Sequence, residues 1–213
     1  LIVRGRTKVT ASDLEAATRL KVVGRAGVGV DNIDLTAARS RGVTVVNAPV
    51  STTLAVAELT FGLLLALARE IPRADSAMKQ GQWRKKDLEG VELSGKTLGI
   101  LGMGRIGAEV ARRARAFEMD VLGYDPMLTP EEIRGRVAEP VDRDELLARS
   151  DFISLHLPLT TETRNMLNAN AFAKMKDGVR IVCAARGGII DEAALLSALE
   201  SGKIGGVALD VFE

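Results

Sequence analysis

The sequence has few of the residues from which disulfides, metal centres and base-stacking surfaces are built. Its 213 residues include one cysteine, one histidine, five phenylalanines, one tryptophan and one tyrosine. A single cysteine excludes an intrachain disulfide, and one Cys with one His argues against a structural zinc site. Twenty-nine basic residues stand against 28 acidic ones, so no overall field attracts polyanions. The sequence therefore predicts no metal, no nucleic acid partner and no membrane partner.

Long apolar runs are also scarce. The most apolar stretch, residues 54–68, contains Glu58, and its uncharged part is too short to span a bilayer. The chain begins Leu-Ile-Val-Arg with no signal-peptide pattern and no methionine, so we expect a fragment of a longer protein. Cys183 ends the apolar run 179–183, which favours a buried structural thiol over a nucleophile. One cysteine fits a reducing compartment, and we expect the protein to be cytoplasmic.

Strand and helix patterns alternate through most of the chain and predict an α/β protein. Residues 1–48 read as β-α-β-α-β, with a helix near 12–20. Residues 49–92 hold a long apolar helix, ended or bent by Pro72, and a polar connecting segment. Residues 93–213 predict a Rossmann-type, doubly wound parallel sheet. Its strands are expected near residues 97–101, 121–124, 152–155, 179–183 and 206–211, and its helices near 105–117, 142–149 and 191–201. A helix that is apolar almost all round is buried between domains or against a second subunit.

A glycine-rich turn separates the first strand and helix of the third region. It reads Gly102, Met103, Gly104, Arg105, Ile106 and Gly107. Gly102 permits a tight turn, Gly104 lets the backbone approach a pyrophosphate, and Gly107 lets the helix lie close to the sheet. The helix start offers free N–H groups to phosphates. The helix carries an apolar face of Ile106, Val110, Ala111, Ala114 and Phe117. This context predicts a dinucleotide site; chance glycines in a β-α turn are the alternative.

An acidic residue, Asp125, directly follows the next expected strand. A carboxylate there accepts hydrogen bonds from the adenosine ribose hydroxyls. It also repels a 2′-phosphate, by up to ~4 kcal/mol for two charges about 4 Å apart near a surface. The sequence therefore predicts NAD in preference to NADP.

Several motifs occur in a fixed order along the chain. They are Arg-Ala-Gly-Val-Gly-Val-Asp-Asn at 25–32, Asn-Ala-Pro at 47–49, the glycine turn at 102–107, Gly-Tyr-Asp-Pro at 123–126, Ala-Arg-Gly-Gly-Ile-Ile-Asp-Glu at 185–192 and Ala-Leu-Asp-Val-Phe at 208–212. Together they resemble the D-isomer-specific 2-hydroxyacid dehydrogenases over essentially all of the sequence. Val3-Arg4, the 25–32 block and residues 92–99 most resemble the members that oxidise 3-phosphoglycerate in serine biosynthesis.

The resemblance implies a fold and an assembly. Residues 1–48 would be part of a flavodoxin-like β/α substrate-binding domain. Residues 49–92 would be a linker and dimerisation helix, and 93–213 an NAD-binding Rossmann domain without its last part. A homodimer or homotetramer is expected, with a 2-hydroxy acid as substrate.

The resemblance also implies which residues line the cofactor. Besides the glycine turn and Asp125, they are His156, Leu157, Pro158, Thr163, Ala184, Ala185, Arg186 and Asp210. Asp210 would face the nicotinamide carboxamide. An aspartate at an ordinary strand-to-loop turn is the alternative.

Arg186 is the candidate catalytic residue. It follows the strand that ends at Cys183, and ligands of doubly wound sheets bind at the carboxyl ends of strands. A guanidinium can hold the carboxylate of a 2-hydroxy acid through two parallel hydrogen bonds and polarise its carbonyl. From the sequence alone, an ion pair with Asp191 or Glu192 is the better explanation of this arginine. The resemblance favours the catalytic role.

The resemblance places five residues of the first region on the substrate side: Arg4, Gly5, Arg25, Gly27 and Val28. Two arginines and exposed N–H groups suit a doubly charged substrate such as 3-phosphoglycerate. Ordinary strand-end arginines are the alternative. Lys85 and Lys86, near Trp83, could reach a substrate phosphate across a dimer interface, although basic linkers are usually just solvated.

His156 is a candidate proton donor because imidazole titrates near neutral pH. Its motif, Ser-Leu-His-Leu-Pro, instead matches cofactor-lining residues of the family. The resemblance puts the catalytic histidine and the glutamate that orients it beyond Glu213, which stands two positions before the expected acid. We therefore expect the 213-residue chain to bind NAD but to turn over poorly or not at all.

Other functions stay open at this point. Glyoxylate or hydroxypyruvate reductase and D-lactate dehydrogenase are alternatives within the family. A different class is an NAD-sensing binding protein, like the transcriptional corepressors that share the fold. Arg186 and Arg4 favour an enzyme over a sensor.

Overall fold

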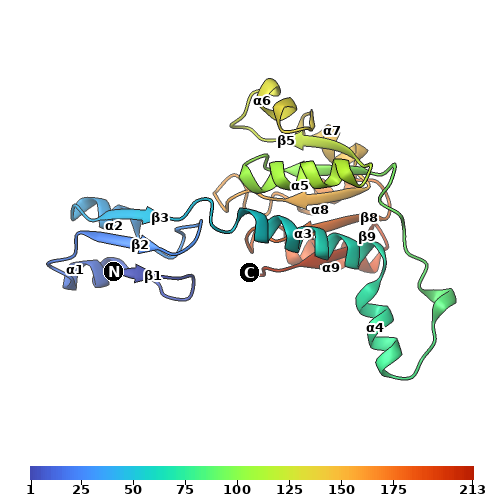
Figure 1. The fold of residues 1–213 in the computed structure, drawn as a ribbon, viewed down its shortest axis with the longest axis horizontal. Coiled ribbons are helices and arrows are strands. Elements are labelled where there is room, and N and C mark those ends of the chain that lie inside the picture. The colour runs from blue at the N-terminus through green and yellow to red at the C-terminus, as the bar shows by residue number, and fades with distance from the viewer. The chain divides into compact units, whose positions relative to one another are not determined.

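The computed structural model describes residues 1–213, which form two compact units, Leu1–Ala55 and Val56–Glu213 (Figure 1). Each unit is described by itself below. The helix α3, Thr53–Ala68, begins in the first unit and runs into the second. The division into residues 1–48, 49–92 and 93–213 stays a prediction.

The first unit contains a three-stranded parallel sheet in the order β1-β2-β3. The strands are β1 Ile2–Val3, β2 Val22–Arg25 and β3 Thr44–Asn47, and the helices are α1 Ala11–Ala16 and α2 Leu35–Ser40. Leu14, Val23 and Ile33 form its buried core. Thr10 and Asp34 cap the two helices through their side chains, which fixes where each helix begins.

The second unit is built on a six-stranded, all-parallel sheet in the order β6-β5-β4-β7-β8-β9. The strands are β4 Thr97–Leu101, β5 Asp120–Tyr124, β6 Glu139–Pro140, β7 Phe152–Leu155, β8 Val179–Cys183 and β9 Ile204–Leu209. The chain therefore adds β5 and β6 on one side of β4. It then returns to place β7, β8 and β9 on the other side. That is the strand order of a Rossmann-like sheet.

Helices cover both faces of this sheet. The helices of this unit are α3, α4 Ile71–Lys79, α5 Arg105–Ala116, α6 Pro130–Gly135, α7 Arg143–Arg149, α8 Ala169–Lys174 and α9 Glu192–Glu200, with a short 3-10 helix at Lys85–Asp87. One buried cluster joins α3 and α5 to the sheet through Phe61, Leu64 and Val110. The other lies under α7, α8 and α9 and includes Phe172 and Leu195. The predicted α/β architecture of the third region is confirmed.

The apolar helix α3 is buried along one face only. Ala57, Phe61, Leu64 and Ala68 face the core, whereas Leu59 on the opposite side is exposed. Within this chain the helix is thus apolar on its exposed side as well as on its buried side. Its predicted burial against a second subunit stays a prediction.

The region after α3 is more helical than its sequence suggested. Glu70 adopts a left-handed conformation, which ends α3, and Pro72 then lies in the first turn of α4. A proline is tolerated there because the first helical N–H groups have no intrahelical acceptor. Figure 1 shows α4 and the segment after it projecting away from the sheet.

Other element predictions were inaccurate at their edges. The helix expected over 12–20 ends at Ala16, because Ala17 leaves helical geometry. The last strand lies two residues earlier than expected, at Ile204–Leu209. Phe117 is not in the core: it is 41% exposed and stacks on Phe61 at the end of α5. The short elements α6, β6 and α8 were not predicted.

The structure bears directly on one sequence-based expectation about chemistry, the buried thiol of Cys183. Cys183 is a free, buried cysteine, and burial raises the pKa of its thiol. The prediction of a buried thiol is therefore confirmed. None of the helices has the length and apolar character needed to cross a membrane. His, Cys, Asp and Glu side chains do not gather in groups of three or more that could hold a metal ion.

Candidate functional site

The carboxyl ends of five neighbouring strands bring the predicted cofactor residues of the second unit to one edge of the sheet. The glycine turn follows β4, Asp125 follows β5, residues 156–158 follow β7, residues 184–186 follow β8, and Asp210 follows β9. Strand order reverses between β4 and β7. The carboxyl edge at such a reversal is where open α/β sheets bind their ligands.

The glycine turn is packed tightly at two of its three glycines and open at the third. Gly102 has φ +96°, and an added Cβ would lie 2.8 Å from the carbonyl of His156. At Gly107 an added Cβ would lie 2.1 Å from the carbonyl oxygen of Gly102. At Gly104 an added Cβ would meet nothing within 4 Å. Two glycines therefore shape the turn, and the third leaves free space above it.

The start of α5 lies at this free space. Gly104 is the N-cap and provides no side chain to bond the first N–H groups of the helix. Arg105 is exposed in the first turn, whereas Ile106 packs against the core. Free N–H groups and the positive end of the helix dipole suit an anion such as a pyrophosphate. The residues present thus fit a dinucleotide.

Asp125 is tied to the glycine turn by its own side chain. One carboxylate oxygen accepts a hydrogen bond from the Met103 N–H at 2.9 Å, and the other from the Met127 N–H at 3.0 Å. The carboxylate is half-buried beside the turn. Its lone pairs exceed these two bonds, so it can accept ribose hydroxyls as well.

The segment after β7 lies against the glycine turn. The His156 N–H donates to the Leu101 carbonyl at 2.8 Å, and the His156 ring shares a 2.8 Å hydrogen bond with the Ser154 hydroxyl. Leu157 is buried, and Pro158 is exposed. The hydroxyl of Thr163 donates to the Pro158 carbonyl at 2.6 Å and so fixes the loop.

Arg186 lies in the loop that follows β8, after Ala184 and Ala185, and all three are half-buried. Its guanidinium donates to the Ala185 carbonyl at 2.7 Å. The sequence alternative was an ion pair with Asp191 or Glu192. The Asp191 carboxylate accepts the Ala194 N–H at 3.0 Å as a helix cap. The Glu192 carboxylate accepts the Glu213 N–H at 2.8 Å.

A glycine is required directly after Arg186. An added Cβ at Gly187 would lie 1.9 Å from the Phe212 carbonyl oxygen, so the loop runs in direct contact with the segment after β9. Asp210, at the start of that segment, is exposed, and its N–H donates to the Cys183 carbonyl at 2.9 Å. The loops that follow β8 and β9 thus lie side by side.

In the first unit, the predicted substrate residues lie at the carboxyl ends of β1 and β2. Arg25 is half-buried, and its guanidinium lies over Gly27, donating to the Ala26 carbonyl at 3.0 Å. The Gly27 N–H was expected to be free, but it donates to the Arg25 carbonyl at 2.9 Å. An added Cβ at Gly5 would lie 3.5 Å from the Arg25 guanidinium.

The remaining substrate candidates are less constrained. Arg4 is exposed, and the Val28 carbonyl accepts a hydrogen bond from the Asn47 side chain at 2.6 Å. Lys85 and Lys86 form the exposed short helix after α4, and Trp83 beside them is 78% exposed. The side chains of Lys85 and Lys86 make no ion pair within this chain.

Residues 61–213 match the model of the D-isomer specific 2-hydroxyacid dehydrogenase NAD binding domain. The chain belongs to this family. The family predicted from the sequence motifs is thus confirmed, and so is NAD as the cofactor of the domain.

Relatives within the family carry more than one name. The chain is 52% identical to D-3-phosphoglycerate dehydrogenase of Archaeoglobus fulgidus, over 100% of this chain and 40% of that protein. It is also 52% identical to hydroxypyruvate reductase of Thermotoga maritima, over 100% of this chain and 69% of that protein. The chain therefore spans about two fifths of the length of the phosphoglycerate dehydrogenases it matches.

A solved dehydrogenase of the family has the same fold. The D-lactate dehydrogenase of Aquifex aeolicus, complexed with NAD and lactic acid, superposes with a TM-score of 0.91 at 38% identity. The match covers 100% of this chain and 64% of that one. The six-stranded Rossmann-like sheet and the small three-stranded sheet are thus those of a 2-hydroxyacid dehydrogenase.

One residue near the dehydrogenase glycine turn was missed by the sequence reasoning. The Arg136 guanidinium donates to the Met103 carbonyl, while Asp125 accepts from the Met103 N–H. Arg136 directly follows α6, and the next residue, Val137, has a left-handed φ of +59°, which is strained for a β-branched side chain. The contact joins residues 33 positions apart through an unpredicted helix, so no local signal could have found it.

His156 is a poor proton carrier at neutral pH. Burial of the ring lowers its pKa from 6.5 to about 4. A base whose folded pKa is depressed binds fewer protons in the folded state than in the unfolded state between these two values. The His156 contribution to stability is therefore present above pH 6.5 and is lost as the pH falls toward 4.

We expect this loss to reach about 3 kcal/mol in the free energy of unfolding. The measurement is urea unfolding of the chain and of a His156→Gln variant at several pH values between 4 and 7. The free energy of unfolding is plotted against pH for each protein. Carboxylates titrate in both proteins, so the difference between the two slopes gives the contribution of the histidine. Equal slopes would show that the ring is not held neutral.

Proposed function

We propose that the chain provides the cofactor site of an NAD-dependent dehydrogenase that oxidises C2 of 3-phosphoglycerate. The observation that carries this proposal is the shared sheet edge, where the glycine turn, Asp125 and Arg186 follow neighbouring parallel strands. The first two suit an NAD pyrophosphate and ribose, and the third suits an acid's carboxylate. Oxidation of a 2-hydroxy acid requires all of these groups in one place.

The proposed role of Arg186 is to bind and polarise the substrate. Its guanidinium would hold the carboxylate through two hydrogen bonds and attract the negative charge that gathers on the C2 oxygen. NAD supplies the hydride acceptor. The C2 hydroxyl proton must pass to a base. His156 does not fit that role, because its neutral ring has a pKa of about 4.

The proposed roles of Arg186 and His156 lead to different expectations for NAD binding and for catalytic turnover. We propose that the 213 residues bind NAD on their own, without efficient oxidation of a hydroxy acid. Robust turnover by the purified 213-residue chain would contradict this, because it would require an efficient base among these residues.

The proposed site for the anionic end of the substrate is in the first unit, which we propose to be part of a flavodoxin-like substrate domain. Arg25 and Gly5 lie together there, and Arg4 directly precedes Gly5. Arg25 Nε is buried without a hydrogen-bond partner. A buried guanidinium N–H with no acceptor is costly, and a phosphate or carboxylate oxygen would satisfy it.

A substrate panel tests the choice of acid. The full-length protein should show its highest kcat/KM, with NAD or NADH, for 3-phosphoglycerate over hydroxypyruvate, glyoxylate and D-lactate. Hydroxypyruvate reduction is the second candidate, because the chain matches the Thermotoga maritima reductase over 69% of its length. A preference for an unphosphorylated acid would overturn the proposed substrate and leave the cofactor site intact.

We also propose that the protein is a homodimer or homotetramer. The support is the exposed apolar side of α3, where Leu54 and Leu59 are 54% and 42% exposed. Sedimentation of the purified protein tests the assembly directly.

Asp125 is expected to set the preference between NADH and NADPH. An Asp125→Ser substitution removes the negative charge, so the ratio of NADH to NADPH affinity should fall by about tenfold. Titration calorimetry with both dinucleotides measures the ratio.

Asp125→Asn is the matched variant for this prediction. The amide keeps an oxygen that can accept the Met103 N–H bond but carries no charge. If repulsion of the 2′-phosphate is the cause, Asp125→Asn narrows the ratio as much as Asp125→Ser does. A ratio unchanged in both variants would remove Asp125 from the ribose site.

A further inference from the structure

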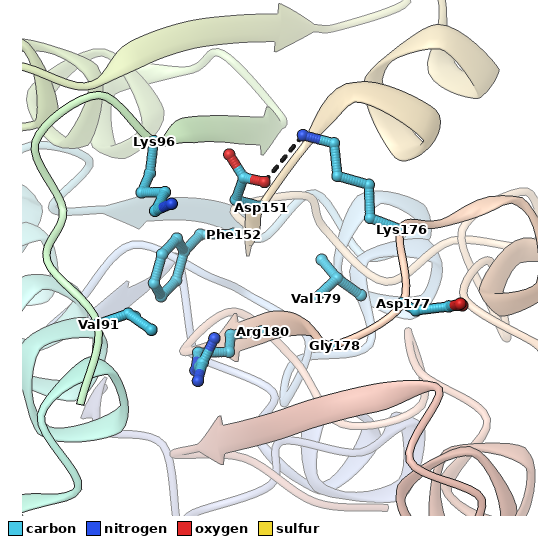
Figure 2. Close-up of a pocket in the computed structure, with 9 residues that line it drawn as sticks. All are labelled: Val91, Lys96, Asp151, Phe152, Lys176, Asp177, Gly178, Val179 and Arg180. Carbon is cyan, nitrogen blue, oxygen red and sulfur yellow. Dashed lines mark hydrogen bonds and ion pairs between the residues drawn. The ribbon is translucent and has the colours of Figure 1, made fainter. Parts of the chain in front are cut away.

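A cavity of about 160 Å³ opens at the edge of the six-stranded sheet where the strands begin, opposite the cofactor edge. Figure 2 shows that its walls come from the starts of β4, β7 and β8 and from the segment before β4. The polar side chains that matter here are Lys96, Asp151, Lys176, Asp177 and Arg180, around the ring of Phe152. None of them belongs to the cofactor site.

The two carboxylates of this cavity are already balanced. Asp151 accepts the Thr97 N–H at 2.9 Å and pairs with the Lys176 ammonium at 2.8 Å. These contacts hold the pKa of Asp151 below its usual range despite its partial burial. Asp177 pairs with the Lys203 ammonium at 2.7 Å. The positive charges left over are those of Lys96 and Arg180.

Arg180 is placed unusually for an arginine. It lies on β8, in register with Phe152 on β7 and Gly206 on β9, and is half-buried in the interior of the sheet. Its guanidinium lies 5.8 Å from the centre of the Phe152 ring. It makes no hydrogen bond or ion pair with any acceptor of this chain. Within the chain its guanidinium thus has only this cation–π contact, and none of its N–H donors is paired with a protein acceptor.

We propose that this cavity binds a small oxyanion, a phosphate or a short carboxylate, through the Arg180 guanidinium. The planar fork of arginine matches two oxygens of such an anion. Lys96 is exposed at the cavity mouth and adds positive charge. Figure 2 shows Lys96 and Arg180 on opposite sides of the Phe152 ring. At about 160 Å³ the cavity holds roughly five water-sized groups, enough for a phosphate but not for a nucleotide.

The proposal is independent of the proposed function. An NMR titration tests it, because it reports both where phosphate binds and with what Kd. Sodium phosphate is titrated into the ¹⁵N-labelled 213-residue chain at constant ionic strength. The amides of Gly178 and Arg180 report this cavity, whereas the Gly104 amide reports phosphate bound at the glycine turn. We expect saturable shifts at Gly178 and Arg180.

Variants that remove one positive charge each then identify which side chain binds the anion. Arg180→Gln should weaken the phosphate Kd read at Gly178 by about tenfold or more, the loss expected for charge-assisted hydrogen bonds. Lys96→Gln, at an exposed position, should weaken it by a smaller factor. Arg41→Gln removes an exposed arginine of the first unit and should leave the Kd unchanged.

Two results would overturn the proposal. One is the absence of saturable shifts at Gly178 and Arg180 in the unmodified chain. The other is an Arg180→Gln variant that folds and binds phosphate as the unmodified chain does. If Arg180→Gln does not fold, Arg180→Lys keeps the charge without the fork, and an unchanged Kd in that variant, together with an unchanged Kd in Lys96→Gln, contradicts the proposal equally.

Discussion

Replacing Arg186 with glutamine is expected to lower kcat/KM for the 2-hydroxy acid by about a hundredfold to a thousandfold in the full-length protein. Glutamine keeps some of the length and hydrogen-bonding capacity of the side chain but carries no charge. It can neither pair with the substrate carboxylate nor stabilise negative charge on the C2 oxygen. NADH affinity should change much less than kcat/KM, because the proposed charge interactions of Arg186 are with the substrate even though the residue also lines the cofactor site. Steady-state kinetics and NADH titration measure the two effects separately.

Two further variants sharpen this test. Arg186→Lys keeps the charge without the two-pronged geometry and should fall between the parent and Arg186→Gln. Arg134→Gln removes an exposed arginine of α6, which pairs only with Glu131, and should behave as the parent does. A parental kcat/KM in Arg186→Gln would exclude the catalytic role. A loss of melting temperature and of NADH affinity together would indicate a structural role instead.

Alanine at either of two glycines of the same turn is expected to weaken NADH binding, but only one of the two variants should lose stability. At Gly104 the added methyl group enters open space on the protein side but occupies the approach of the pyrophosphate. NADH affinity should fall by about a hundredfold while stability changes by no more than about 1 kcal/mol. At Gly107 the same methyl group would lie 2.1 Å from the Gly102 carbonyl oxygen. The free energy of unfolding should fall by about 1 to 3 kcal/mol, and NADH affinity should be lost as well.

Gly135 provides the matched control, because an added Cβ there also meets nothing within 4 Å but lies at the end of α6, outside the turn. Gly135→Ala should leave both stability and NADH affinity close to the parental values. Thermal unfolding and NADH fluorescence titration on the three variants suffice. Parental NADH affinity in Gly104→Ala would show that the pyrophosphate does not approach this backbone.

The sequence predicted the strand, glycine turn and helix around residues 97–117 because the signals for these elements are local. The glycine turn, Asp125 and Asp191 each depend on backbone conformations or caps that a few neighbouring residues determine. The strand order follows from the general rule for alternating strands and helices. These features required no knowledge of distant contacts.

What the sequence did not predict depends on distant contacts or on elements too short to show a period. Strand β6 has two residues and α8 has six, so neither carries a hydrophobic repeat. Pro72 was expected to end or bend the long helix, whereas the left-handed Glu70 ends α3 and the proline lies in the first turn of the next helix. Arg136 contacts Met103, and Arg180 lacks an acceptor, only because of tertiary packing.

NADH titration calorimetry on the purified, folded 213-residue chain is the most direct test of the central claim, that these residues form a complete NAD site. The account predicts a single saturable site for NADH. NADPH should bind to it at least about tenfold more weakly. Absence of saturable NADH binding by the folded chain would contradict it.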